Sequence, residues 1–275
     1  MSNTLQHNIL YSCVEKKEKG HEQFVPEHAL SYLLSGEIEF FTEKGREKAE
    51  EGCIALIRRN QLAKTVKIPP KDGSELKSVN IFLTQDILRR FAGDNNIHNQ
   101  KRYDGESMLL VPKTPFIKAY FASLIPYFEQ PEELTDNLAE IKTREAIELL
   151  LKISPQFREM LFDFNEPYKI DLESYMNRNF MFNVPIEKFA KLTGRSLATF
   201  KRDFNKVFQI PPQRWLLKKR LDHAHFLISQ QHLKPTEAYV DAGFENLSHF
   251  SFAFKKEFGY PPTKLSETKD LVLLT

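Results

Sequence analysis

Cysteine is nearly absent from this sequence: Cys13 and Cys53 are the only two among 275 residues. Two cysteines are too few for the disulfide framework of a small secreted protein or for a Cys-rich zinc site. We therefore interpret both as reduced structural thiols, and we expect the protein to hold no metal and no cofactor.

Long apolar runs and blocks of like charge are also missing. No stretch approaches the roughly 20 apolar residues that a membrane-spanning helix requires, and the opening MSNTLQHNILYSC lacks the basic region and apolar core of a secretory signal. Hydrophobic residues make up 41% of the chain and charged residues 28%, without a low-complexity tract. We expect a chain that folds throughout, in the cytoplasm and away from membranes, with two domains.

The positive charge is concentrated in the C-terminal part. Asp171 to Thr275 holds 16 Lys and Arg against 11 Asp and Glu, whereas the first 170 residues hold 23 against 26. Within the C-terminal part, Lys191 to Arg220 carries nine basic residues and one acidic residue, Asp203. This excess suits the phosphate backbone of a nucleic acid. The solvated face of an ordinary helix has a similar composition, so charge alone leaves both interpretations open.

Residues 1–110 are predicted to form short strands. Turn residues at Gly36, Lys44-Gly45 and Lys71-Asp72-Gly73 separate four apolar runs. The runs are Ala29 to Leu34, Glu37 to Thr42, Cys53 to Arg58, and Val79 to Leu83. This pattern predicts a small antiparallel β-barrel, followed by a short helix from Ile87 to Phe91.

Residues 111–165 are predicted to be helical. Apolar residues recur at helical spacing in two successive segments. They are Ile117, Tyr120, Phe121, Leu124 and Ile125, and then Leu134, Leu138, Ile141, Ala146, Leu149 and Leu150. The two helices are expected to form a hairpin that either packs on the barrel or pairs with its twin in a homodimer. The segment Asn165-Glu166-Pro167 is the best candidate for a linker.

The C-terminal part repeats itself at an offset of 50 residues. The offset places seven residues of the first copy on identical residues of the second. These pairs are Leu197 and Leu247, Phe200 and Phe250, Phe204 and Phe254, Lys206 and Lys256, Phe208 and Phe258, Pro211 and Pro261, and Pro212 and Pro262. In each copy the Phe residues at i, i+4 and i+8 predict one buried stripe of a helix.

Each copy has the order of a helix-turn-helix unit. In the first, Pro185 begins a helix, Thr193-Gly194-Arg195 forms the turn and Ser196 caps the next helix. In the second, Pro235 begins a helix, Ala242-Gly243-Phe244 forms the turn and Asn246 is the cap. Pro212 to Ser229 is predicted to be one long connecting helix. Two such units on a rigid connector suit two successive major-groove segments, about 34 Å apart.

The exposed faces of the two longer helices carry the candidate DNA-binding residues. The first set is small or hydrogen-bonding and suits base edges; it comprises Ser196, Ala198, Thr199, Lys201, Arg202 and Asn205. The second set comprises Asn246, Ser248, His249, Phe252 and Lys255. The alternative is a helical bundle whose Phe stripes only form a core.

The C-terminal hundred residues resemble the DNA-binding domain of the AraC/XylS family of bacterial transcription regulators. The resemblance lies in GRSLATFKRDFNKVFQIPPQRWLLKKRLDHAHFLI and in DAGFENLSHFSFAFKKEFGYPP. It implies an all-α domain over residues 171–268 that binds double-stranded promoter DNA, commonly as an activator that contacts RNA polymerase.

The family's base-reading positions fall on residues of both copies. In the first copy they are Ala198, Lys201 and Arg202, and in the second they lie near Ser248, His249 and Phe252. Phe252 departs from the family, which often has a basic residue there, because a phenyl ring touches a thymine methyl group but cannot hydrogen-bond guanine.

Two further expectations follow from the resemblance and the charge pattern. Tyr239 stands where the family usually has a small residue, so the packing of the second unit is expected to be shifted. Lys218, Lys219 and Arg220 are expected to face phosphate or solvent.

The resemblance also implies a cupin-like barrel in the N-terminal part, which gives an α+β fold for the whole chain. This domain is expected to sense a small-molecule effector, bind a regulatory protein or dimerise. A pocket with convergent polar groups would favour a ligand. A solid core of Phe24, Phe40, Phe41, Ile54, Leu56, Ile81 and Phe82 would favour dimerisation or protein binding. A metal-dependent enzyme is not expected, because His21 and His28 are isolated.

Overall fold

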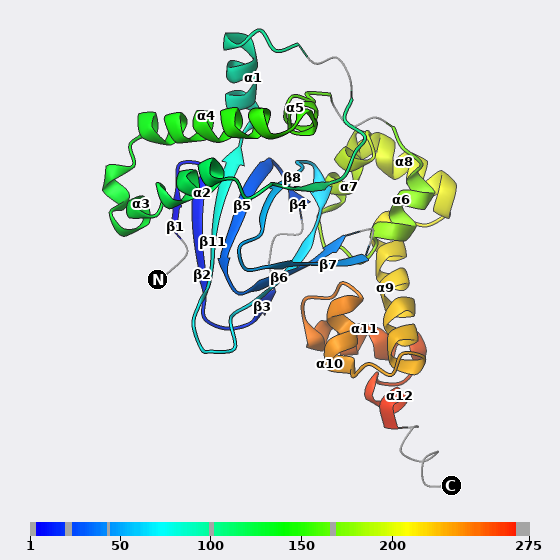
Figure 1. Ribbon diagram of the computed structural model, residues 1–275. Helices are drawn as coiled ribbons and strands as arrows, with labels where there is room; N and C mark the ends of the chain where they lie inside the picture. The colour runs from blue at the N-terminus through cyan, green and yellow to red at the C-terminus, as the bar shows by residue number, and fades with distance from the viewer. Residues whose placement is uncertain (1–3, 20–23, 43–44, 99–101, 166–168, 268–275) are drawn as a thin grey trace. The chain divides into compact units, whose positions relative to one another are not determined.

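The computed structural model describes most of the chain as two compact units (Figure 1). The first unit is Met1–Asn165 and the second is Glu166–Thr275. Strands and helices make up the first unit, and the described part of the second contains helices alone, which confirms the α+β class. The described residues are 4–19, 24–42, 45–98, 102–165 and 169–267.

A six-stranded antiparallel sheet is the larger sheet of the first unit, with the order β1-β2-β11-β5-β8-β12. Its strands are β1 Thr4–Gln6, β2 Ile9–Val14, β5 His28–Ser35, β8 Ile54–Ile57, β11 Leu76–Leu83 and β12 Met108–Leu110. Three of the four predicted strand runs lie here, in β5, β8 and β11. Strand β2 was not predicted, because buried Ser12 breaks its apolar alternation.

A four-stranded antiparallel sheet, β3-β10-β6-β7, faces the larger one. Its strands are β3 Glu18–Lys19, β6 Glu37–Thr42, β7 Gly45–Glu50 and β10 Lys64–Ile68, and a separate pair is β4 Phe24–Val25 with β9 Gln61–Leu62. Among the described strands the two larger sheets do not close into one hydrogen-bonded ring. The predicted barrel therefore takes the form of two facing sheets.

Helices cover the outer face of the larger sheet (Figure 1). They are α1 Gln85–Asp94, α2 Pro115–Ala122, α3 Pro126–Glu129, α4 Asp136–Ile153 and α5 Pro155–Leu161, with a 3-10 turn at Pro131–Glu133. Phe121 of α2 packs on Tyr32 with ring centroids 4.9 Å apart, and Phe128 of α3 stacks on Tyr11 at 4.5 Å. The buried stripes of α2 and α4 thus belong to one core with the sheet.

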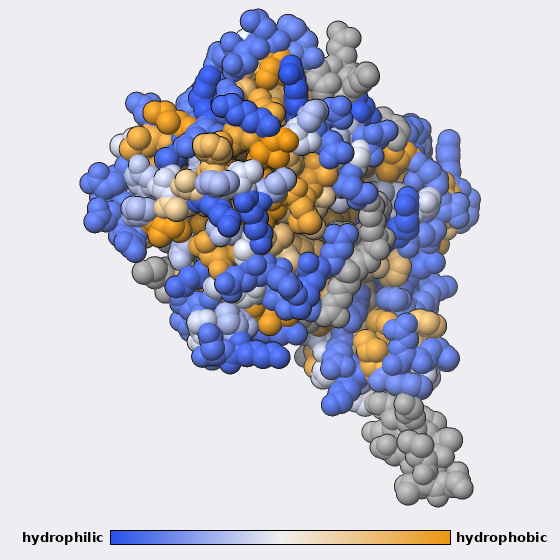
Figure 2. Space-filling view, viewed as in Figure 1, coloured by the Kyte–Doolittle hydropathy of each residue, from blue (hydrophilic) through white to orange (hydrophobic). Residues whose placement is uncertain are grey.

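Some large apolar side chains of the first unit remain exposed. Figure 2 shows apolar residues reaching the surface over its helical part, whereas polar residues cover most of the second unit in that view. The exposed large side chains of the first unit are Leu110, Phe116 and Ile141. Among the described helices, none is long and apolar enough to cross a membrane.

His28 lies in the core of the first unit, and His21 lies outside the described residues. Burial, followed by the nearby Arg59 and Arg58, lowers the pKa of His28 to about 3. Its neutral ring accepts the backbone N–H of Arg59 at Nδ1, at 3.3 Å. Across the described part of the chain, no three His, Cys, Asp or Glu side chains come together as a metal site. His28 is therefore a core histidine.

The second unit consists of two short helical arrays joined by one long helix. Its helices are α6 Leu172–Asn179, α7 Ile186–Leu192, α8 Leu197–Phe208, α9 Pro212–Ser229, α10 Pro235–Asp241, α11 Leu247–Phe258 and α12 Thr263–Glu267. The predicted connector from Pro212 to Ser229 is α9. Its first half buries Trp215 against Phe204, and its second half packs Leu221 and Ala224 in the core around Phe250 and Phe254.

Candidate functional sites

The first helix-turn-helix unit is α7, a tight turn and α8. The turn is closed by buried Thr193, whose hydroxyl donates to the Phe189 carbonyl at 2.9 Å, and by Gly194 with φ +65°. Ser196 then begins α8 as predicted, since its Oγ accepts the N–H of Thr199 at 3.3 Å. The hydroxyl of Thr193 and the Ser196 cap fix the angle at which α8 leaves the turn.

The second helix-turn-helix unit is α10, a turn and α11. Gly243 has φ +95°, and a Cβ atom there would clash with the carbonyl oxygen of Met181 and lie 2.9 Å from its carbon. Only glycine meets both requirements. Asn246 begins α11 as predicted, because its Oδ1 accepts the N–H of His249 at 3.0 Å.

The two copies differ by one residue within the turn. Equivalent backbone bonds, from Arg195 to Ala190 and from Phe244 to Tyr239, are 49 residues apart, whereas the caps Ser196 and Asn246 are 50 apart. Glu245 is thus the additional residue of the second turn. The uniform offset of 50 therefore holds for α8 and α11 and fails for the helices before them.

Tyr239 is accommodated at the edge of the second core. Its ring lies 6.2 Å from that of Phe250, and it remains half-buried. The close approach of α10 to its neighbours is made instead by Ala238 and Ala242, which are fully buried. The large residue that the sequence analysis singled out thus packs beside the helix contact.

The predicted residues of α8 lie together on its outer face. Five of the six are exposed and Thr199 is half-buried; the exposed ones are Ser196, Ala198, Lys201, Arg202 and Asn205. The Ser196 hydroxyl donates to that of Thr199 at 3.0 Å, so these two side chains are engaged at the start of the helix. Ala198, Lys201, Arg202 and Asn205 form the remaining outward surface.

The predicted residues of α11 are all exposed. They are Asn246, Ser248, His249, Phe252 and Lys255. Asn246 is engaged as the helix cap, and the His249 ring lies 6.0 Å from that of Phe244. Phe252 is 70% exposed, an unusual state for a phenyl ring.

Asp203 connects α8 to the rest of the unit. Its Oδ2 accepts Lys169 Nζ and Arg195 Nε, both at 3.1 Å, and these hydrogen bonds lower the pKa of Asp203. The Arg195 side chain is only 7% exposed and also donates to the Ile170 carbonyl at 3.0 Å. One cation of the basic segment therefore serves the fold, which a charge count could not reveal.

Arg220 is a second internal cation, and the expectation that it faces phosphate or solvent was wrong. Its guanidinium donates to the carbonyl oxygens of Phe180 at 2.8 Å and Phe182 at 2.9 Å, and to Asn183 Oδ1 at 3.0 Å. Burial lowers the pKa of Arg220 to about 10, so it stays charged at neutral pH. The residue ties α9 to the segment between α6 and α7, while Lys218 remains exposed.

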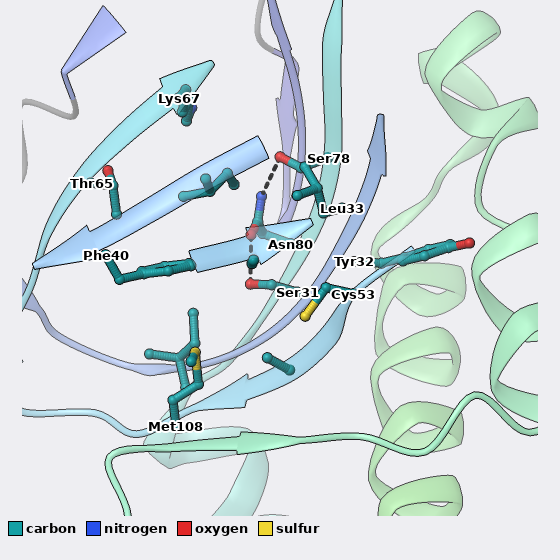
Figure 3. A pocket seen from close by; sticks show the side chains of 14 residues that line it. Ser31, Tyr32, Leu33, Phe40, Cys53, Thr65, Lys67, Ser78, Asn80 and Met108 are labelled. Atoms are coloured by element: carbon teal, nitrogen blue, oxygen red, sulfur yellow. Dashed lines mark hydrogen bonds between the residues drawn. The ribbon is translucent and has the colours of Figure 1, made fainter. Parts of the chain in front are cut away.

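A cavity of about 150 Å³ lies between the two sheets of the first unit (Figure 3). On one wall, Ser31 Oγ donates to Asn80 Oδ1 at 2.7 Å, and Asn80 Nδ2 donates to Ser78 Oγ at 3.4 Å. The facing wall contributes Thr65 and Lys67. The rest of the lining is mostly apolar, with Leu33, Ile38, Phe40, Ala49, Ala55, Ile57 and Met108.

Lys67 is the charged group of this cavity. Its Nζ donates to Ser12 Oγ at 2.9 Å and lies 3.9 Å from Glu18 Oε1. Burial lowers the pKa of Lys67. Of the residues proposed to fill the barrel, Ile54, Leu56 and Ile81 instead join the core shared with the helices, so the space between the sheets is not packed solid.

Two helix-turn-helix units on one linker helix define the second unit as a DNA-binding domain. Comparison with known proteins agrees: residues 189–268 match the helix-turn-helix domain family HTH_18, and residues 28–161 match the ExsA N-terminal regulatory domain. The virulence regulon transcriptional activator VirF of Yersinia enterocolitica is 25% identical over 89% of this chain and 92% of its own. The regulator ExsA of Pseudomonas aeruginosa is 26% identical over 48% of this chain and 49% of its own.

Solved structures of such regulators also align with the chain. Apo ToxT from Vibrio cholerae covers 94% of this chain and 97% of its own, with 11% identity and a TM-score of 0.47. From the family matches and the relatives, the chain belongs to the AraC/XylS family of transcription regulators. It is a DNA-binding regulator of transcription with an N-terminal regulatory domain.

Proposed function

We propose that the chain activates transcription by placing α8 and α11 in two successive major-groove segments of promoter DNA. The observation that carries the proposal is the repeated, capped helix with an exposed polar face on either side of α9. The activator named among the relatives supports the direction of regulation. The protein would act by binding, without catalysis, in the cytoplasm, with RNA polymerase as its partner.

The proposal assigns roles within α8 and α11. Lys201 and Arg202 would donate to base edges and Asn205 would hydrogen-bond a base or phosphate, because all three are exposed on one helix face. Ser196 and Asn246 would lie beside the phosphate backbone at the helix starts. His249, Ser248 and Lys255 would form the corresponding surface of α11.

Genome-wide capture of DNA fragments by the purified chain tests this proposal. At near-physiological salt we expect one enriched motif that spans two adjacent major grooves, and we expect Lys201→Ala plus Arg202→Ala to abolish it, since each base contact contributes about 1–3 kcal/mol. Lys218→Ala plus Lys219→Ala removes the same charge outside α8 and should retain the motif. Salt-sensitive capture without any common motif would contradict the proposal.

The first unit is proposed to sense a small-molecule effector in the cavity between its sheets. An amphipathic cavity with convergent Ser31, Asn80 and Lys67 side chains has the composition of a ligand site. A homodimer through the same unit is the alternative role, supported by the exposed side chains of Leu110, Phe116 and Ile141.

Filling the cavity tests the sensing role. Ala55 lines it, and Ala55→Met adds three heavy atoms in a volume of about 150 Å³. With a reporter driven by a captured promoter, we expect this variant to bind the promoter while losing the response to growth conditions that wild type shows. Ala122→Met makes the same change at an exposed alanine of α2 and should respond as wild type does. A normal response of Ala55→Met would remove the cavity from the sensing mechanism.

A further inference from the structure

The phenyl ring of Phe252 occupies the middle of the outer face of α11. It is 70% exposed, and it follows exposed Ser248 by one helical turn and precedes exposed Lys255 by another. Phe250 and Phe254 on either side of it in sequence are fully buried. The core therefore has no use for Phe252, whose ring faces solvent on the face proposed to meet DNA.

The internal repeat identifies the position that Phe252 fills. Between α8 and α11 the offset is 50 residues, so Phe252 is the counterpart of Arg202, whose side chain is 66% exposed. The neighbouring counterparts also lose charge, because Ser251 stands for Lys201. The two helices thus present different chemistry to the same depth of the groove.

The two side chains select different bases. A guanidinium donates two hydrogen bonds to the O6 and N7 atoms of guanine, whereas a phenyl ring neither donates nor accepts and gains only by leaving water. The apolar group of the major groove is the C5 methyl of thymine. Lys255 lies one turn further along α11, where its charge suits a phosphate.

We infer that Phe252 makes α11 a reader of thymine methyl groups, so that the binding site has a guanine-reading half under α8 and a thymine-reading half under α11. This inference rests on the proposed function. It has a directional consequence: the unequal halves orient the protein along the promoter. Phe252→Arg is expected to exchange the thymine preference for a guanine at the same position.

Replacing thymine with deoxyuridine, which lacks only the methyl group, tests the inference. A duplex selected by the full-length chain from a random pool would be titrated with deoxyuridine at each thymine in turn. At one or two positions in one half of the site we expect wild type to bind three- to fivefold more weakly, as the burial of one methyl group predicts. Phe252→Ala should bind the thymine and deoxyuridine duplexes equally there. Because Phe252 is exposed, the variant should keep the circular dichroism and melting temperature of wild type.

Other outcomes would overturn the inference. An equal deoxyuridine effect in wild type and Phe252→Ala would place the methyl contact on another residue. Unchanged affinity of Phe252→Ala for every duplex would assign the ring to a protein partner. In either case, a motif that depends on Lys201 and Arg202 would leave the proposed function standing, and its absence in wild type would refute that function separately.

Discussion

Gly243→Ala is expected to destabilise the second unit by about 2–4 kcal/mol. Alanine at φ +95° costs about 1 kcal/mol, and its Cβ would meet the backbone of Met181, which cannot move aside as a flexible side chain does. Overpacking of this kind adds about 1–3 kcal/mol. Trp215 is the only tryptophan of the chain and is buried in the second unit, so its fluorescence during urea unfolding reports on this unit.

Gly259→Ala is the matched control. Gly259 has φ +81°, similar to that of Gly243, but nothing lies within 4 Å of a Cβ atom there. We expect it to lose about 1 kcal/mol, from the positive φ alone. Equal losses for the two variants would mean that the contact with Met181 contributes nothing.

Arg220→Met should lower the free energy of unfolding of the same unit by about 3 kcal/mol. Methionine keeps the apolar stem of the side chain, while three acceptors, the carbonyls of Phe180 and Phe182 and the Asn183 side chain, lose their donor. Hydrogen bonds from a charged group contribute about 1.5–3 kcal/mol each, and water would replace part of them.

Lys218→Met controls for the loss of a basic residue on α9, because Lys218 is exposed. It should change the unfolding free energy by less than about 0.5 kcal/mol. Should Arg220→Met unfold at the same urea concentration as Lys218→Met, the three hydrogen bonds would not be what holds α9 to the segment before α7.

Local signals made the second unit predictable from its sequence. Ser196, Asn246 and Pro212 act within one helical turn, and the buried Phe stripe needs only its own spacing, so the bounds of α8, α9 and α11 follow from nearby residues. The internal roles of Arg195 and Arg220 depend on carbonyl groups 25 to 40 residues away. No local pattern distinguishes such a cation from one that faces DNA.

The first unit was predictable only where its strands are apolar. Strands β7 and β10 carry Lys, Glu and Thr in alternation, because one of their faces is less deeply buried, and the sequence analysis passed over both. The alternation of β5 and β11 marks two faces without indicating which is covered by helices. For this reason Ile54 and Ile81 were assigned to the barrel interior, while the polar wall of Ser31 and Asn80 was not foreseen.

The single backbone contact beneath Gly243 and the grip of Arg220 on the segment before α7 join the two halves of the second unit at both ends of α9's second copy. Such a body behaves as a rigid gauge of helical phase. One base pair inserted between the two halves of a promoter site would rotate the second groove by about 34°, given about 10.5 base pairs per turn. A regulator that cannot flex at its connector would then have to twist the DNA or release one half, which makes promoter spacing itself part of the code it reads.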